Sequence, residues 1–254
     1  MASGVGESNA VFCEFTGYEE ELEVEKSGKV LLFSAGMDST IAYYLLDRPL
    51  CLHVTGHSRY SKSELKYVVD FEERHPEMDL HINYQKWLIK YEEFDSNIPA
   101  RNLLFSTIAS YYGDTIYLIA QKGEQSIPDR NLEFFSDLSE MLTKLHKKPK
   151  LVHPGFPNDT KQDMVRKYLD AGHPKEELWK TYSCESAEPR RCGNCKMCAR
   201  TAFALDYNNI LPDNFFKNDI WKSSAIQEYI KHLDTYEATR AQQTREVLVK
   251  RGLL

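Results

Sequence analysis

The chain has 254 residues, of which 42% are hydrophobic, and its formal net charge is -6 at pH 7. This length can bury one full core and leave room for a small attachment. Positive and negative residues are interspersed, which argues against nonspecific electrostatic binding of nucleic acid or anionic lipid and favours small-molecule partners. No stretch approaches the roughly 20 consecutive apolar residues of a membrane helix, and the first residues lack a signal-peptide pattern, so we expect a cytoplasmic protein.

The first residues predict a pair of strands. The run AVFCEFTGYEEELEV, residues 10–24, alternates polar and apolar residues around Thr16 and Gly17, which is typical of two short strands joined by a turn. We therefore expect residues 1–27 to form a strand pair ahead of the main fold.

Short apolar runs then alternate with longer helical patterns. Strands are expected at residues 30–34, 49–55, 79–84, 115–120 and 149–154, and helices from about residue 38 and within 63–75, 101–113, 132–146 and 160–172. Strands separated by helices imply right-handed parallel crossovers. Residues 28–183 should form a Rossmann-like doubly wound parallel sheet, whose ligands bind outside the carboxyl ends of the strands. Residues 184–254 should form a small four-cysteine zinc module with C-terminal helices.

The first strand ends in small and hydroxylated residues. In FSAGMDST, residues 33–40, the hydroxyls of Ser34, Ser39 and Thr40 are donors, and small residues let the backbone approach an anion where a helix begins. We expect phosphate here, with Asp38 either capping the helix or helping to hold magnesium. The patterns GxxxxGK[ST] and GxGxxG are absent. The alternative is an ordinary tight turn with a Ser or Asp helix cap.

Four cysteines crowd into the segment CESAEPRRCGNCKMC. Cys184, Cys192, Cys195 and Cys198 could complete a tetrahedral zinc site, which is structural because a catalytic zinc keeps one position open. An iron–sulfur cluster or redox-active cysteine pairs are the alternatives.

The run FSAGMDST resembles the SGGxDS loop of the PP-loop ATP pyrophosphatases, with Ala35 in place of the first glycine. A methyl at this position is tolerable at negative φ, but costs on the order of 1 kcal/mol where the backbone needs a glycine conformation. The resemblance implies an adenine nucleotide alpha hydrolase-like fold and an ATP site made of Phe33, Ser34, Ala35, Gly36, Met37, Asp38, Ser39 and Thr40.

The loop and the cysteines together make the chain similar to the 7-cyano-7-deazaguanine synthase (QueC) family from about Lys29 to Leu205. Four further stretches carry the similarity, namely HVTGHSRYSKSEL, IPARNLLFSTIASYY, SIPDRNLEFF and TKQDMVRKYLDAG. The resemblance implies that the catalytic residues are Ser34, Asp38, Ser39, Arg101 and Lys161, and that substrate contacts are made by Arg59, Asn102, Asp129 and Glu133. Taken singly, Asn102 could be a helix cap, Lys161 an exposed helix lysine and Asp129 a turn former.

The resemblance implies the conversion of 7-carboxy-7-deazaguanine and ammonia to 7-cyano-7-deazaguanine through an adenylated carboxylate and an amide. It also implies ATP, bound with magnesium, as a substrate, and zinc as a structural metal. Residues 123–127 and 130–131 depart from the family pattern, which keeps open a reaction that stops at the amide or acylates another amine. A PP-loop tRNA-modifying ligase or thiolase and a non-catalytic nucleotide-binding subunit are further alternatives. We expect no direct nucleic-acid binding and no membrane contact, and a homodimer is compatible with the sequence.

Overall fold

The computed structural model describes residues 28–254 apart from residues 57, 94–97, 187 and 189. The strand pair expected over residues 1–27 lies outside the described residues. The strands are β1 (Lys29–Leu32), β2 (Leu50–Thr55), β3 (Leu80–Tyr84), β4 (Thr115–Gln121) and β5 (Leu151–Phe156). The helices are α1 (Met37–Leu45), α2 (Ser61–Arg74), α3 (Arg101–Ala109), α4 (Leu132–His146), α5 (Lys161–Asp170), α6 (Lys175–Trp179), α7 (Lys196–Tyr207), α8 (Ser224–Lys231) and α9 (Ala238–Lys250), with short 3-10 helices at Lys86–Tyr91, Ile220–Lys222 and Leu233–Thr235.

The five strands form one parallel sheet in the order β3-β2-β1-β4-β5. Val30 of the central strand pairs with Leu50 on one side and Ile116 on the other. Consecutive strands run outward from β1 to β3, and the chain then returns to build β4 and β5 beyond β1. The strand order therefore reverses between β1 and β4, and this switch point is where doubly wound sheets bind their ligands.

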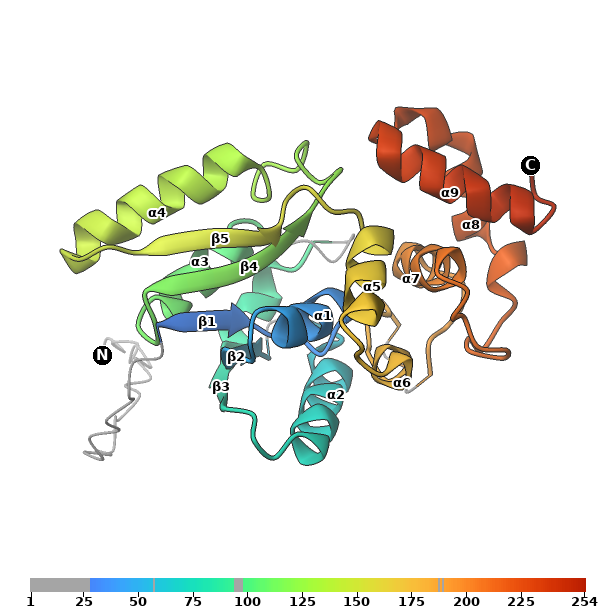
Figure 1. The fold of residues 1–254 in the computed structure, drawn as a ribbon. Coiled ribbons are helices and arrows are strands. Elements are labelled where there is room, and N and C mark those ends of the chain that lie inside the picture. The colour runs from blue at the N-terminus through green and yellow to red at the C-terminus, as the bar shows by residue number, and fades with distance from the viewer. Residues whose placement is uncertain (1–27, 57, 94–97, 187, 189) are drawn as a thin grey trace, which may run out of the picture.

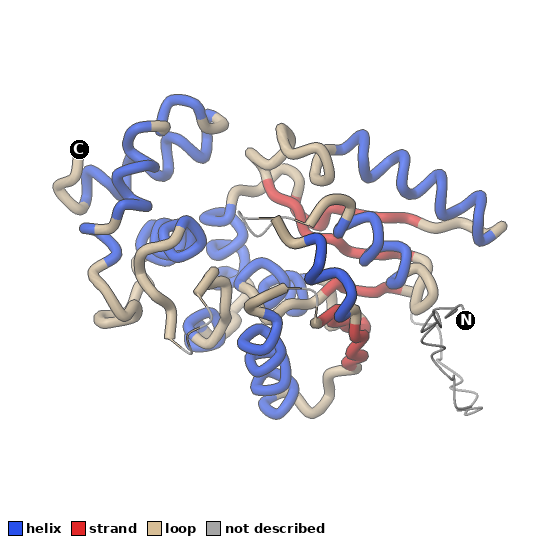
Figure 2. The backbone as a smooth tube through the Cα atoms, turned by 180° about the vertical axis from the view of Figure 1, so that it is seen from behind, coloured by secondary structure: helices blue, strands red, loops and turns tan. Residues whose placement is uncertain are grey.

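Helices cover both faces of the sheet, as the sequence predicts (Figures 1 and 2). On one face, α1, α2 and α5 pack on a core that includes Leu31, Ile41 and Met164. On the other face, α3 and α4 pack on a core that includes Val30 and Phe135. Because β1 contributes to both cores, its apolar residues form a continuous run instead of an alternation. The doubly wound α/β fold is confirmed.

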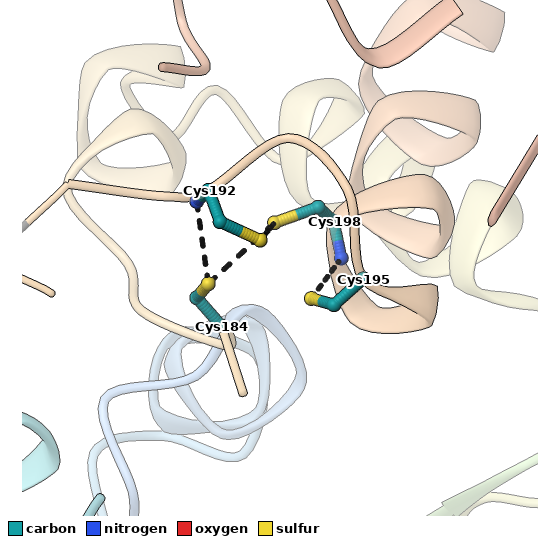
Figure 3. A group of neighbouring side chains, drawn as sticks. All are labelled: Cys184, Cys192, Cys195 and Cys198. Atoms are coloured by element: carbon teal, nitrogen blue, oxygen red, sulfur yellow. Dashed lines mark hydrogen bonds between the residues drawn. The ribbon is translucent and has the colours of Figure 1, made fainter. Parts of the chain in front are cut away.

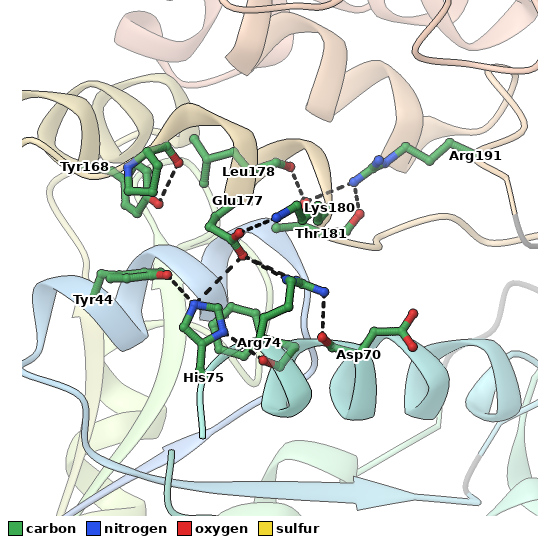
Figure 4. A network of polar contacts seen from close by, with 12 residues as sticks. Tyr44, Asp70, Arg74, His75, Tyr168, Glu177, Leu178, Lys180, Thr181 and Arg191 are labelled. Carbon is green, nitrogen blue, oxygen red and sulfur yellow. Dashed lines mark hydrogen bonds and ion pairs between the residues drawn. The ribbon is translucent and has the colours of Figure 1, made fainter. Parts of the chain in front are cut away.

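A polar network holds the short helix α6, which the sequence pattern does not predict. Figure 4 shows Glu177 among two cations and a histidine: its carboxylate accepts from Lys180 Nζ at 2.6 Å and from Arg74 Nη2 at 3.3 Å. His75 Nε2 lies 2.6 Å from the hydroxyl of Tyr44 on α1. The network ties α6 to α1 and α2, and so directs the chain that follows it across the carboxyl ends of the strands.

The C-terminal helices form a separate apolar cluster beside α5. Figure 1 shows α7 between α5 and the helices α8 and α9. The ring of Phe203 on α7 lies 5.2 Å from that of Tyr229 and 6.0 Å from that of Trp221. The predicted C-terminal helices are therefore confirmed. Among the residues that the structure describes, no helix is long and apolar enough to cross a bilayer.

Candidate active site and metal centre

A cavity of about 520 Å³ opens at the carboxyl ends of β1, β2 and β4. Its lining combines the loop after β1, the start of α3, the loop after β4 and the cysteine segment. The predicted residues in its wall are Phe33, Ser34, Gly36, Asp38, Ser39, Arg101, Asn102, Asp129 and Cys184. The fold therefore brings half of the predicted site residues to the switch point of the sheet.

Two predicted substrate residues do not line this cavity. Arg59 is exposed and forms an ion pair with Glu92 at 3.8 Å. Glu133 is exposed in the first turn of α4. Three loop residues, Ala35, Met37 and Thr40, are buried behind the cavity wall. Their side chains support the loop and do not line the cavity.

The 33–40 loop ends at an uncapped helix. Gly36 is the N-cap of α1 and no side chain caps it. The hydroxyl of Ser39 instead turns back, donating to the Gly36 carbonyl at 3.1 Å and accepting from Ser34 N at 3.2 Å. The helix-cap alternative for the Ser and Asp side chains is therefore wrong, and the first-turn amides of α1 keep their capacity to bind an anion.

Ala35 adopts the backbone conformation that favours glycine, with φ of 51°. For a residue with a Cβ, this left-handed conformation costs about 1–2 kcal/mol. The carbonyl of Ala35 accepts a hydrogen bond from Tyr182 N at 2.9 Å, which joins the loop to the segment that leads into the cysteines. A Cβ at the next residue, Gly36, would lie 3.2 Å from the hydroxyls of Ser34 and Ser183. The loop is thus closely packed, and it contains a strained alanine.

Lys161 is a buried cation beside the loop, 5% exposed. Its Nζ lies 2.7 Å from Asp38 Oδ1 and 2.8 Å from Oδ2. Lys161 opens α5, where Thr160 and Asp163 form a capping box that fixes the helix start. Burial lowers the pKa of Lys161, and the charge of Asp38 opposes that shift. The reading of Lys161 as an exposed helix lysine is wrong, because this pairing removes it from solvent.

The start of α3 faces the same cavity. The N-cap of α3 is Ala100, which is left-handed with φ of 59°, so the helix already includes Asn102. The amide of buried Asn102 donates to the Asp129 carbonyl at 3.4 Å, and so ties α3 to the loop after β4. The reading of Asn102 as a helix cap is therefore wrong. Arg101 lies in the cavity wall one residue earlier.

Glu124 organises a charge cluster that the sequence reasoning missed. Its Oε1 accepts from Arg200 Nη2 at 2.7 Å and from Arg130 Nη1 at 2.9 Å. Burial by itself would raise the pKa of Glu124, but the two guanidinium groups hold it at about 2. Both arginines line the cavity. The one sequence signal for Arg200 is a charged residue inside the otherwise apolar helix pattern ARTAFAL.

Glu64 is a second acidic residue of the cavity that was not predicted as part of the site. It lies in the first turn of α2 and lines the cavity, and its Oε2 is buried without a hydrogen-bond partner among the described residues. Burial raises the pKa of Glu64 to about 7, while the charge of Arg101 opposes the shift. Its signal was the Glu-Leu pair in HVTGHSRYSKSEL, which marks the family resemblance without indicating a role.

The four cysteines form one cluster (Figure 3). Their sulfur atoms all lie within 4.8 Å of one another, and the sulfur of Cys198 is 3.8 Å from that of Cys184 and 3.9 Å from that of Cys192. Four sulfurs at tetrahedral Zn–S bonds of about 2.3 Å would be separated by about 3.8 Å. Without a cation, hydrogen bonding with the Cys184 sulfur raises the pKa of Cys198, since the thiols cannot all ionise together. The donor set and spacing fit a four-coordinate metal ion.

The backbone around the cluster is shaped for this arrangement. Amide groups donate to the sulfurs, among them Cys192 N to Cys184 at 3.3 Å and Cys198 N to Cys195 at 3.4 Å. Gly193 has φ of 72°, and a Cβ there would lie 2.5 Å from the Asn218 carbonyl. Cys195 is the N-cap of α7, so the positive end of that helix faces the sulfurs.

Fold and site together define a class: α/β proteins with a loop and an uncapped helix start at the switch point of a parallel sheet and a four-cysteine cluster that could hold a metal ion. Within that class, the family model described as queuosine biosynthesis protein QueC matches residues 77–209, and the chain belongs to this family. It is 28% identical to the 7-cyano-7-deazaguanine synthase of Archaeoglobus fulgidus over 227 residues, which are 77% of this chain and 92% of the relative.

Two further relatives carry the same name. The 7-cyano-7-deazaguanine synthase of Methanosphaerula palustris is 30% identical over 205 residues, covering 66% of this chain and 90% of the relative. That of Thermoplasma acidophilum is 28% identical over 207 residues, covering 69% of this chain and 86% of the relative. The resemblance read from the loop and cysteines is confirmed at the level of the family.

Proposed function

We propose that this chain is an ATP-dependent C–N ligase that converts 7-carboxy-7-deazaguanine and ammonia to 7-cyano-7-deazaguanine. The observation that carries the proposal is the convergence of the uncapped 33–40 loop and Arg101 on one cavity at the switch point, where Asp38 lines the wall and pairs with buried Lys161. The names of the relatives support the product. The cavity volume of about 520 Å³ suits small-molecule ligands.

The chemistry follows from the low reactivity of a carboxylate. A carboxylate oxygen attacks the α-phosphate of ATP, which releases pyrophosphate and leaves an acyl adenylate. Ammonia then attacks the carbonyl carbon, AMP leaves, and an amide results after loss of a proton. The amide oxygen is adenylated by a second ATP with release of a second pyrophosphate, and loss of AMP and both amide protons leaves the nitrile. Alignment and charge stabilisation are the protein's main contributions.

We assign the 33–40 loop to the ATP phosphates. The first-turn amides of α1 and the hydroxyl of Ser34 would bind phosphate oxygens, and Lys161 and Arg101 would offset the charge that develops as pyrophosphate leaves. A magnesium ion held by Asp38 would supply further neutralisation of the phosphates. Asn102 and Asp129 are assigned to the acceptor side of the cavity.

We assign zinc to the four cysteines as a structural metal, because four thiolates fill its tetrahedral shell. The zinc segment and the C-terminal helices, residues 184–254, would then form an attachment to the domain at residues 28–183. Since Cys184 and Arg200 line the cavity, this attachment would also complete the site. We expect the protein to act in the cytoplasm on small molecules.

The test is a reaction with ATP, magnesium, ammonium and 7-carboxy-7-deazaguanine, followed by mass spectrometry of the base and by pyrophosphate release. Nitrile with two pyrophosphates supports the proposal, amide with one pyrophosphate replaces it by a reaction that stops early, and no turnover contradicts it. Lys161→Gln should lower the rate of pyrophosphate release by about 100-fold or more. The matched control is Lys167→Gln on the same helix, because Lys167 is exposed and pairs with Asp159 away from the cavity. Equal rates in the two variants would remove Lys161 from the mechanism.

A further inference from the structure

His53 is a buried histidine in the cavity wall to which the family resemblance gives no role. It lies on β2 and is 1% exposed. Its Nδ1 is 2.8 Å from the carbonyl oxygen of Phe33. Because a carbonyl can only accept, Nδ1 must carry the hydrogen, and the other ring nitrogen, Nε2, is left with a free lone pair.

The lone pair of His53 Nε2 has no partner among the residues that the structure describes. Burial lowers the pKa of His53 to about 4, so the ring is neutral near pH 7 and Nε2 is an acceptor. Buried acceptors are nearly always satisfied in folded proteins. Since His53 lines the cavity, a hydrogen-bond donor on a bound ligand would supply the partner that Nε2 lacks.

The cavity that His53 lines also has an apolar wall that suits the faces of a flat ring. This wall is built from side chains at the ends of β1, β2 and β4, namely Leu32, Phe33, Leu52, Val54, Leu118 and Ile119. Phe33, whose carbonyl orients His53, directly precedes Ser34 at the start of the 33–40 loop. A nucleotide with its phosphates on that loop would therefore have this apolar wall within reach of its base.

We propose that His53 recognises the adenine of ATP, with Nε2 accepting a hydrogen bond from the exocyclic 6-amino group while the apolar wall holds the ring. This inference rests on the proposed use of ATP and adds to it the group that selects the base. A purine without the 6-amino group would leave the acceptor unpaired. The histidine is thus a specificity residue of the nucleotide subsite, separate from the cations that face the phosphates.

The test is a double-mutant cycle between His53 and the 6-amino group, measured as Kd by calorimetry with magnesium and no acceptor substrate. The two ligands are ATP and purine riboside triphosphate, which differs from ATP by lacking the amino group. The wild-type protein should bind ATP about three- to tenfold more tightly than the purine analogue, as expected for one neutral hydrogen bond. In His53→Phe, which keeps a ring but has no acceptor, the two Kd values should become equal within about twofold.

Two further variants separate recognition from folding. His53→Gln supplies another acceptor and should restore part of the preference for ATP. Cys51→Ala, a change two residues away on β2 to a buried thiol that does not line the cavity, should keep the full preference even if it lowers the melting temperature. If His53→Phe retains the wild-type preference, the inference is overturned. A rise in KM for the deazaguanine substrate with an unchanged ATP preference would assign His53 to the other base and overturn it as well.

A wild-type protein that binds neither nucleotide would overturn the proposed function itself and this inference with it. That outcome is distinct from ATP binding without selection at His53, which would leave the proposed function standing. The expected result is ATP binding in all four proteins, with the preference for the amino group strong in wild type and Cys51→Ala, intermediate in His53→Gln and absent in His53→Phe.

Discussion

Replacing Glu64 with glutamine should stabilise the protein at alkaline pH and leave its stability at acid pH nearly unchanged. The pKa of Glu64 is about 7 in the folded protein against an ordinary 4.5. The folded state therefore holds the proton more tightly than the unfolded chain. The stabilisation from the protonated carboxyl is complete below pH 4.5 and is lost as the pH rises through 7. A shift of this size corresponds to about 3 kcal/mol, at about 1.4 kcal/mol per unit.

Thermal unfolding followed by circular dichroism at pH 5 and pH 8 measures this effect. Glutamine cannot ionise, so at pH 8 the melting temperature of Glu64→Gln should exceed that of the wild type by about 6–12 °C, and at pH 5 the two should be close. The control is Glu73→Gln, because Glu73 lies on the same helix and is exposed. A difference between Glu64→Gln and wild type that is the same at both pH values would refute the reasoning, as would an equal response of the control.

Three other substitutions test the loop, the cluster and the metal site. Ala35→Gly relieves about 1–2 kcal/mol of strain from the left-handed backbone conformation. It also loses about 0.8 kcal/mol from burial of the methyl group and about 0.4–1 kcal/mol because the unfolded chain gains conformational freedom. These terms nearly cancel, so the melting temperature should stay within about 3 °C of the wild-type value, and a larger change in either direction contradicts this balance. Glu124→Gln leaves the guanidinium groups of Arg130 and Arg200 without their carboxylate and should cost about 3 kcal/mol, seen as a melting temperature lowered by at least 5 °C. Cys195→Ser should lose bound metal in elemental analysis and melt earlier, whereas full metal occupancy would disprove the four-ligand assignment.

The sequence predicts the sheet because its signals are local. The runs VLLF and LCLHV are continuous because both faces of their strands are buried, and each is followed by a helical pattern. The four-cysteine cluster is equally local, since its ligands lie within one short segment. Helix α6 escaped prediction because it has only five residues and is held by Glu177 and its distant partners, not by an apolar periodicity.

The parts of the site that a single residue does not reveal depend on contacts between distant residues. Lys161 looks like a surface lysine until the fold brings it to Asp38, 123 positions away in the chain. Asn102 looks like a cap until the left-handed Ala100 starts the helix earlier. Arg200 has no motif at all, and its position at the cavity follows from the packing of α7 against α5. The spacing of residues along the chain does not predict contacts between residues that are far apart in the sequence.

The single hydrogen bond from Tyr182 N to the Ala35 carbonyl has a practical consequence for any attempt to reduce this protein to smaller parts. The chain divides near residue 183 when it is read along the sequence, but the wall of the cavity does not divide there, since Ser183, Cys184 and Glu185 all belong to it. A fragment that stops before Tyr182 would keep every residue of the 33–40 loop and lose the Tyr182 amide and the Ser183 side chain against which the loop packs. The complete wall of the cavity therefore extends through the cysteine segment into α7.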